Sequence, residues 1–472
     1  MKKSNLNYFY NLCYQILLVI IPIFLTPYLS RTLGAYEIGI FGFINSVVTI
    51  IITIGLFGVN TYGYREIAFC LDDLEKRTKL FIEIMILRCI LLSFAMITLV
   101  PFLFTKHSLY FFIMIFYIIS QFLDVTWLFI GVENLKIVAV RNFLVKLTST
   151  ILIFIFVKSN KDLPIYFIII SLSSFIISLS IIPNLRKYIN VKRYKSRVIS
   201  KQILFHFINS FKLFLPQIGL VLFLQIDKIM LNFMCGEEYV AYYDYADKIT
   251  AIPLALLSAM CTAYIPYISK LLLSSNNNEL SATINKLLDF SLLLAVPMTF
   301  GIAAIASNLI KWYLAPEFYP VIKTLYFFAP IIIINACINV FGNQYLTVKN
   351  SIKILSVSYF GALLIDIVFN LLFIKYLQDC GAAIATCLGL LFALFVQFFS
   401  VLKDFKITKF FEKLKFFIAG ILMFVCVFFL SNKLNSGLIS TCILILIGII
   451  IYLIVLLLLR QEYFLKMLKK NK

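Results

Sequence analysis

Long apolar runs alternate with short polar stretches along nearly the whole chain. Fourteen of these runs have about 20 residues, the length that an α-helix needs to cross the hydrocarbon core of a bilayer. They cover residues 8–29, 38–60, 80–104, 109–131, 140–157, 163–183, 208–234, 238–266, 284–306, 321–346, 353–375, 381–402, 414–431 and 438–459. The pattern predicts an all-α membrane protein with about fourteen transmembrane helices, or twelve if a pair in the C-terminal part is miscounted.

The positive charges support this count. When the N-terminus is placed in the cytoplasm, most lysines and arginines fall in inner connections, as is typical of membrane proteins. The outer connections then hold Arg31, Lys106, Lys158, Lys161, Lys311, Lys375 and Lys433. A wrong count would scramble this asymmetry, so we expect both termini to be cytoplasmic.

The order of spans predicts four parts. Six spans precede a basic stretch, six follow it, and a final pair completes the chain. The predicted parts are an N-terminal six-helix lobe at 1–184, a basic cytoplasmic linker at 185–203, a C-terminal six-helix lobe at 204–402, and two additional helices with a basic tail at 403–472.

A faint repeat supports two related lobes. Shifting the chain by 202 residues places Gln15 on Gln217, and Gly34 on Gly236, without a gap. An even number of spans in each lobe gives both lobes the same orientation, so we expect a pseudo-two-fold axis along the membrane normal.

Composition agrees with a membrane protein. Hydrophobic residues make up 62% of the chain and charged residues 14%, with a mean hydropathy of +0.99. The net charge of +20 is explained by cytoplasmic loops, and we expect no nucleic-acid partner. The ten cysteines form no Cys-x-x-Cys pair and the two histidines stand apart, so we expect no metal site.

Ionisable residues inside the apolar runs are the candidate functional groups, because each costs about 2.5–3.5 kcal/mol at the bilayer centre unless it has a partner or a hydrated cavity. The seventh and eighth spans hold the richest set. Asp244, Asp247 and Lys248 share one helical face by their i, i+3, i+4 spacing. One interpretation is structural, with Asp244 paired to Lys248 and Asp227 paired to a lysine or arginine.

The other interpretation is a hydrated cavity whose cations hold an anionic substrate. Lys212 and Arg88 have no acid at helical spacing and are therefore the better candidates for binding phosphate, unless a neighbouring helix supplies a partner. Tyr242, Tyr243 and Tyr245 could stack on sugar rings or lie at the membrane interface. The candidate cations are Arg31, Arg88, Lys212, Lys228 and Lys248, and the candidate gate or ion-binding acids are Asp227, Asp244, Asp247 and Asp366.

Several segments carry a resemblance to a known family. They are Pro27–Gly42, Gly58–Ala68, Trp127–Glu133, Asp227–Leu231, and Asn370 followed by Gly381–Thr386. In this order they resemble bacterial polysaccharide flippases of the Wzx type, within the multidrug/oligosaccharidyl-lipid/polysaccharide exporter superfamily. The sequence departs from that family at Asp366, where a neutral amide is common.

The resemblance implies a fold and a cycle. It implies two lobes of the kind seen in multidrug and toxic compound extrusion (MATE) transporters, which alternate the opening of a cationic cavity. The substrate would be an undecaprenyl-diphosphate-linked oligosaccharide repeat unit, passed from the inner to the outer leaflet of the bacterial cytoplasmic membrane for O-antigen, capsule or another polysaccharide. Coupling to a proton or a sodium gradient, and an association with polysaccharide polymerase machinery, stay open. No other cofactor is expected.

Two alternatives stay open. A multidrug antiporter of the same superfamily would share the lobes, but the many cations beside the acids favour an anionic substrate. A membrane polysaccharide polymerase or glycosyltransferase would need a sizeable loop with catalytic residues, and the connections are short. We therefore expect a transporter rather than an enzyme.

Overall fold

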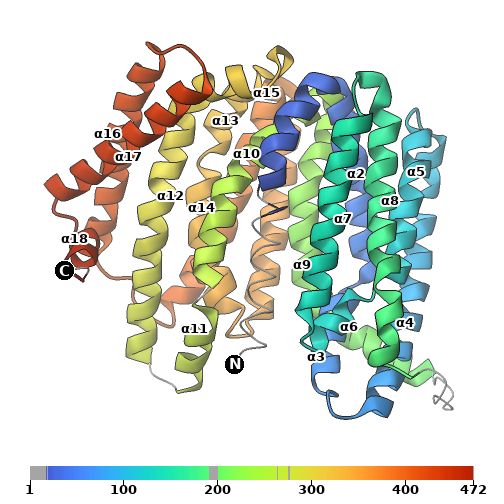
Figure 1. The fold of residues 1–472 in the computed structure, drawn as a ribbon. Coiled ribbons are helices and arrows are strands. Elements are labelled where there is room, and N and C mark those ends of the chain that lie inside the picture. Colours follow the sequence, from blue (N-terminus) through green and yellow to red (C-terminus); the bar gives the residue numbers. More distant parts are fainter. Residues whose placement is uncertain (1–16, 19, 191–199, 263, 275–276, 471–472) are drawn as a thin grey trace. The chain divides into compact units, whose positions relative to one another are not determined.

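The computed structural model of this protein describes residues 17–18, 20–190, 200–262, 264–274 and 277–470 (Figure 1). Every regular element in these ranges is a helix. The all-α fold class expected from the sequence is confirmed.

The chain divides into two compact units, Met1–Gln225 and Ile226–Lys472. The first contains α2 (Ala35–Leu56), α3 (Val59–Ala68), α4 (Leu74–Ile97), η1 (Val100–Phe104), α5 (Ser108–Leu123), α6 (Thr126–Gly131), α7 (Leu135–Phe156), η2 (Asn160–Asp162), α8 (Leu163–Ser180), η3 (Ile182–Lys187) and most of α9 (Ser200–Met234). The second contains the end of α9, α10 (Glu237–Thr262), α11 (Ile265–Leu273), α12 (Asn277–Tyr313), η5 (Pro316–Phe318), α13 (Val321–Phe328), α14 (Ile331–Ile338), the π-helix η6 (Asn339–Leu346), α15 (Ile352–Leu402), α16 (Phe410–Ser431), α17 (Leu438–Leu458) and α18 (Glu462–Lys470). The lobe and linker boundaries expected from the sequence stay predictions.

Ten helices in the described ranges are long and apolar enough to cross a membrane. A bent pair, Pro316–Phe328 and Ile331–Leu346, makes an eleventh span if its two parts, 47° apart, cross together. α15 alone covers two expected spans, because only Gln378, with φ 49° and ψ −126°, interrupts it.

Two further expected spans explain the remaining difference between the fourteen spans expected from the sequence and those identified in the structure. α10 covers residues 238–262 of the expected span at 238–266 but carries more charges than an ordinary apolar span. The expected span at 8–29 lies partly outside the described residues. The count of fourteen therefore stays a prediction.

Large apolar side chains lie on the outward faces of the helices. Phe94 in α4, Leu364 in α15 and Phe429 in α16 are 66%, 64% and 64% exposed. A soluble protein rarely exposes so many large apolar residues, and a bilayer would cover them.

Gly34 and Gly236, which the shift of 202 residues places on one another, share a local conformation. Gly34 precedes α2 with φ 86°, and Gly236 precedes α10 with φ 110°. Residues other than glycine rarely adopt such positive φ values. The two positions therefore use glycine for the same reason, which supports the repeat.

Close packing of α3 on α6 accounts for two segments of the family resemblance. A Cβ atom on Gly63 would lie 2.6 Å from the Trp127 ring, and one on Gly131 would lie 2.7 Å from Ile67. Trp127 is 2% exposed. The glycines at these positions are needed because the helices approach too closely for a side chain.

Candidate functional site

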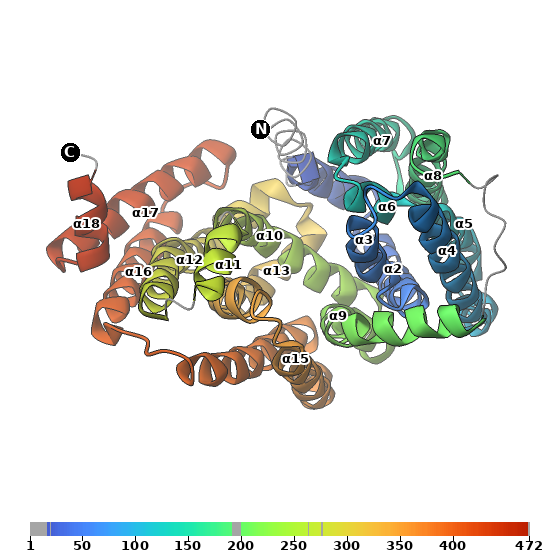
Figure 2. The same cartoon turned by 90° about the horizontal axis from the view of Figure 1, so that it is seen from below.

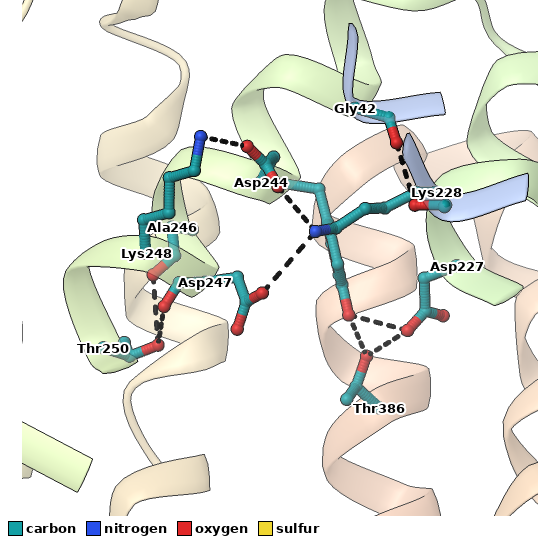
Figure 3. A network of polar contacts seen from close by, with 11 residues as sticks. Gly42, Asp227, Lys228, Asp244, Ala246, Asp247, Lys248, Thr250 and Thr386 are labelled. Carbon is teal, nitrogen blue, oxygen red and sulfur yellow. Dashed lines mark hydrogen bonds and ion pairs between the residues drawn. The ribbon is translucent and has the colours of Figure 1, made fainter. Parts of the chain in front are cut away.

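The richest group of charged residues lies in the second unit, where the end of α9 meets α10. Asp227 and Lys228 are neighbours on α9, and Tyr243 and Asp244 are neighbours on α10. The Tyr243 hydroxyl donates to Asp227 and the Lys228 ammonium donates to Asp244. Two adjacent polar contacts therefore join the helices (Figure 3).

Asp244 is held by two cations. Its Oδ1 lies 2.5 Å from Lys228 Nζ, and its Oδ2 lies 2.7 Å from Lys248 Nζ. Lys228 Nζ also lies 3.7 Å from Asp247 Oδ2 (Figure 3). The Asp244–Lys248 pair predicted from helical spacing is confirmed, and Lys228 was not recognised as its second partner.

Exposure divides this cluster of Lys228, Asp244, Asp247 and Lys248 into an inner and an outer half. The side chains of Lys228 and Asp244 are 10% and 8% exposed, whereas those of Lys248 and Asp247 are 36% and 45% exposed. Lys228 is therefore committed to the buried carboxylate of Asp244, and Lys248 is the cation of the cluster that a substrate can reach.

Asp227 has neutral partners. Its carboxylate accepts hydrogen bonds from the Tyr243 hydroxyl at 2.6 Å, the Asn370 amide at 2.6 Å and the Thr386 hydroxyl at 3.1 Å. Asp227 is fully buried. The predicted pairing with a lysine or arginine is wrong for the described part of the chain, since α10 and α15 supply neutral donors instead.

Asp366 adds a second carboxyl group beside Asp227. It precedes Asn370 by one helical turn on α15 and is fully buried. Both Asp366 oxygens and the Asn370 Oδ1 lack a hydrogen-bond donor among the described residues. Two carboxylates at such close range in an apolar interior repel, so the pair requires a proton or another cation.

The side chains of Asp227, Asp366, Asn370 and Thr386 together suit a small hard cation or a proton, because they offer carboxyl, amide and hydroxyl oxygens. No group of three or more His, Cys, Asp or Glu residues with metal-ligand geometry occurs within the described ranges. We refer to these four residues as the carboxyl pocket.

Sequence reasoning missed the partners of Asp227. Tyr242, Tyr243 and Tyr245 are 9%, 3% and 0% exposed, so none is a sugar-stacking platform or an interfacial side chain. Asn370 and Thr386 were recognised in the segments that resemble the family, but without a role. The resemblance was the one feature of the sequence that pointed to Asn370 and Thr386, since helical spacing cannot link residues on α15 to Asp227 on α9.

Arg88 in the first unit is fully buried. Its Nε donates to the Gln121 carbonyl at 2.8 Å, its Nη1 donates to Asn60 Oδ1, and its Nη2 lies 3.7 Å from Asp124 Oδ2. The neighbouring-helix partner, which the sequence left open, is present, and the interpretation of Arg88 as an unpaired phosphate ligand is not supported by this geometry.

Arg88 lies beside a break in the fourth expected span. α5 ends at Leu123 and α6 begins at Thr126, whose N–H donates to Asp124 Oδ1 at 3.1 Å. Arg88 therefore neutralises a carboxylate at the point where the backbone leaves helical geometry.

Lys212 and Arg31 are the candidate cations of the first unit that are exposed. No carboxylate of the described chain lies within ion-pair distance of Lys212, which sits on α9. Lys212 therefore keeps the availability for an anion that the sequence predicts.

Replacing Arg88 with alanine is expected to lower the free energy of unfolding by about 2–3 kcal/mol, since Asp124 and the Gln121 carbonyl lose a charged donor. Denaturant titration in detergent micelles measures this loss. The matched control is Lys212→Ala, which should change stability by less than about 0.5 kcal/mol. Equal stabilities would contradict the structural role of Arg88.

Comparison with known proteins places the chain in a family. The model of the family described as "Polysaccharide biosynthesis protein" matches residues 6–272. The "Putative O-antigen transporter" of Escherichia coli (strain K12) is 26% identical over 376 residues, covering 77% of this chain and 88% of that protein. "Lipid II flippase MurJ" of Bacillus subtilis (strain 168) is 28% identical over 160 residues, covering 33% of this chain and 29% of that protein.

Solved structures share the fold. A lipid II flippase MurJ in an inward closed conformation aligns with a TM-score of 0.63 at 17% identity, covering 95% of this chain and 97% of that chain. An inward-facing MATE family multidrug transporter of the MOP superfamily aligns with a TM-score of 0.63 at 15% identity, covering 83% and 94%. The MATE-like fold is confirmed, and with a family match over more than half its length, this chain belongs to the polysaccharide biosynthesis protein family.

Proposed function

We propose that this protein is a flippase for lipid-linked oligosaccharides. The family match and the relatives described as an O-antigen transporter and a lipid II flippase support this class of substrate. The observation that carries the proposal is the charged cluster of Lys228, Asp244, Asp247 and Lys248 where the end of α9 meets α10. Ionisable residues inside membrane-spanning helices are costly to insert, and they therefore usually mark a functional site.

The substrate of this proposal is an undecaprenyl-diphosphate-linked repeat unit. It moves from the inner to the outer leaflet of a bacterial cytoplasmic membrane by alternating access, in a chain whose two termini are cytoplasmic. In the second unit the partly exposed Lys248 binds the diphosphate, and in the first unit the exposed Lys212 and Arg31 are the residues available for it. Lys228 and Arg88 position carboxylates instead. Polysaccharide polymerase machinery consumes the exported unit.

The carboxyl pocket binds the coupling ion, a proton or a sodium ion. Whether the ion is bound decides whether Asp227 keeps its hydrogen bond from the Tyr243 hydroxyl, which is 2.6 Å long. Since Tyr243 precedes Asp244 on α10, a change at Asp227 reaches Asp244 and, through it, Lys248, which binds the substrate. The acids at 227 and 366 therefore serve the ion, and those at 244 and 247 orient the lysines.

Replacing Lys248 with alanine is expected to reduce export of the lipid-linked oligosaccharide by about tenfold, because the diphosphate loses one charge-assisted contact. The measurement uses a strain whose only copy of this flippase is the variant, and quantifies lipid-linked sugar on the inner leaflet. The matched control is Lys433→Ala, an exposed lysine between α16 and α17.

The outcome separates the alternatives. Unchanged export in Lys248→Ala, Lys212→Ala and Arg31→Ala would contradict the cationic binding site. If loss of the whole protein leaves the glycan intact but changes drug sensitivity, the multidrug antiporter replaces the flippase.

A further inference from the structure

The N-terminal end of α16 and the short α18 form a surface that the proposed transport cycle does not use. Phe410 and Phe411 begin α16 and are 64% and 81% exposed. Met467 and Leu468 in the second turn of α18 are also exposed. These four residues are the apolar part of what we call the C-terminal surface.

Polar contacts hold the two segments together. Lys409 forms an ion pair with Glu462, and the Glu462 N–H donates to Glu412 Oε2 at 3.1 Å. Lys415 lies 2.5 Å from the same Glu412. Residues just before α16 and just after α17 therefore meet at one end of the α16–α17 hairpin. Figure 2 shows α16, α17 and α18 together at one edge of the second unit.

α18 is amphipathic by its spacing. Tyr463, Phe464, Met467 and Leu468 follow the i, i+1, i+4, i+5 pattern of one helical face, and Lys466 points to the other. Tyr463 and Phe464 are half-buried against the protein, while Met467 and Leu468 continue the apolar face outward. This division into an apolar and a charged face is typical of helices that lie in a membrane interface.

Cations flank the two segments along the chain, since Lys403 and Lys406 precede α16 and Arg460 precedes α18. Lys403, Lys406 and Arg460 are exposed and form no ion pair with a described carboxylate, and Lys466, 73% exposed, lies 3.7 Å from Glu462. The local acids are already engaged, since Asp404 binds Lys349 at 2.6 Å and Glu412 binds Lys415. The surface therefore carries excess positive charge beside exposed aromatic rings.

We propose that the C-terminal surface binds the anionic headgroups of the inner leaflet, with α18 lying in the membrane interface. The aromatic and aliphatic side chains enter the headgroup boundary, and Lys403, Lys406 and Lys466 contact lipid phosphates. This surface anchors the C-terminal helix pair. It acts whichever substrate the protein carries, so it does not depend on the proposed flippase activity.

The test uses the full-length protein in vesicles, with Leu468→Trp as the reporter and the parent protein, which has two tryptophans, as baseline. Two vesicle preparations are compared, each consisting mainly of phosphatidylcholine and each with the same fraction of lipid brominated on its acyl chains. In one preparation the brominated lipid is phosphatidylglycerol, and in the other it is phosphatidylcholine. We expect the brominated phosphatidylglycerol to quench the reporter at least about twofold more strongly. Phe411→Trp is a second, conservative reporter.

The excess quenching should fall by about fivefold in the variant K403Q/K406Q/K466Q, because each cation near an anionic surface contributes to lipid binding. The matched control, K158Q/K161Q/K433Q, removes three exposed lysines elsewhere and should leave it unchanged. Inorganic phosphate should reduce the excess no more than chloride at equal ionic strength. Equal quenching by both lipids overturns the headgroup preference, and quenching by neither overturns membrane contact in favour of water or a soluble partner.

Discussion

Replacing Asp366 with asparagine is expected to abolish the dependence of transport on a cation gradient while leaving the fold intact. The amide places a neutral donor beside Asp227, whose carboxylate already accepts bonds from Tyr243, Asn370 and Thr386. The carboxyl pocket then has one fixed charge and no need for a further cation. The factor by which the gradient stimulates transport should fall by roughly a hundredfold, which corresponds to a coupling free energy near the upper end of the typical range.

Two measurements test this expectation. In proteoliposomes, transport of the lipid-linked substrate is followed with and without a proton or sodium gradient. In detergent, sodium should raise the unfolding temperature of the parent protein more than potassium does if sodium is the ion, since a ligand that binds only the folded state stabilises it. If the proton is the ion, neither salt discriminates and only the proton gradient drives transport.

The matched control is Asp379→Asn, which changes another buried aspartate on α15. Asp379 accepts a hydrogen bond from Thr324 and lies outside the carboxyl pocket. It should keep its gradient dependence. Full gradient dependence in Asp366→Asn, or an equal loss in Asp379→Asn, would show that the pocket does not bind the coupling ion.

Local spacing explains what the sequence could predict. Asp244 and Lys248 are four residues apart on α10, and their pairing follows from helix geometry alone. The long apolar runs likewise predicted an all-helical fold, because the thickness of the bilayer sets the length of a membrane-spanning helix. Gly34 and Gly236 could be related by sequence because a positive φ restricts the residue type.

Tertiary packing explains what the sequence could not predict. Asn370 and Thr386 are separated from Asp227 by 143 and 159 residues, and their contact depends on how α15 packs against α9. Arg88 was interpreted as unpaired because Asp124 lies on another helix, at a break that hydropathy does not reveal. Residue type identified the charged groups, but only packing distinguishes a buried partner from an accessible ligand.

Replacing Lys228 with methionine is expected to lower the free energy of unfolding by about 3–5 kcal/mol, the typical cost of leaving one partner of a buried ion pair unpaired. Asp244 would keep Lys248, but that lysine is partly exposed and its interaction is screened by water. Asp247 would lose its contact with Lys228 as well. Lys248→Met is the matched control, and it should cost at most about 1 kcal/mol.

The double variant K228M/D244N separates a buried pair from a substrate ligand. Removing both charges leaves Lys248 and Asp247 without these partners, but their side chains are 36% and 45% exposed and are solvated by water. No charge then stays buried and unpaired at positions 228 and 244, so the double variant should recover most of the stability lost in Lys228→Met. Denaturant titration of the parent, both single variants and the double variant gives the coupling free energy of the pair. Because Lys228 and Asp244 are 10% and 8% exposed, we expect this coupling to be unchanged when the lipid-linked substrate is added. A coupling that weakens with substrate would assign Lys228 to substrate binding, whereas a coupling near zero would mean that the two charges do not stabilise one another.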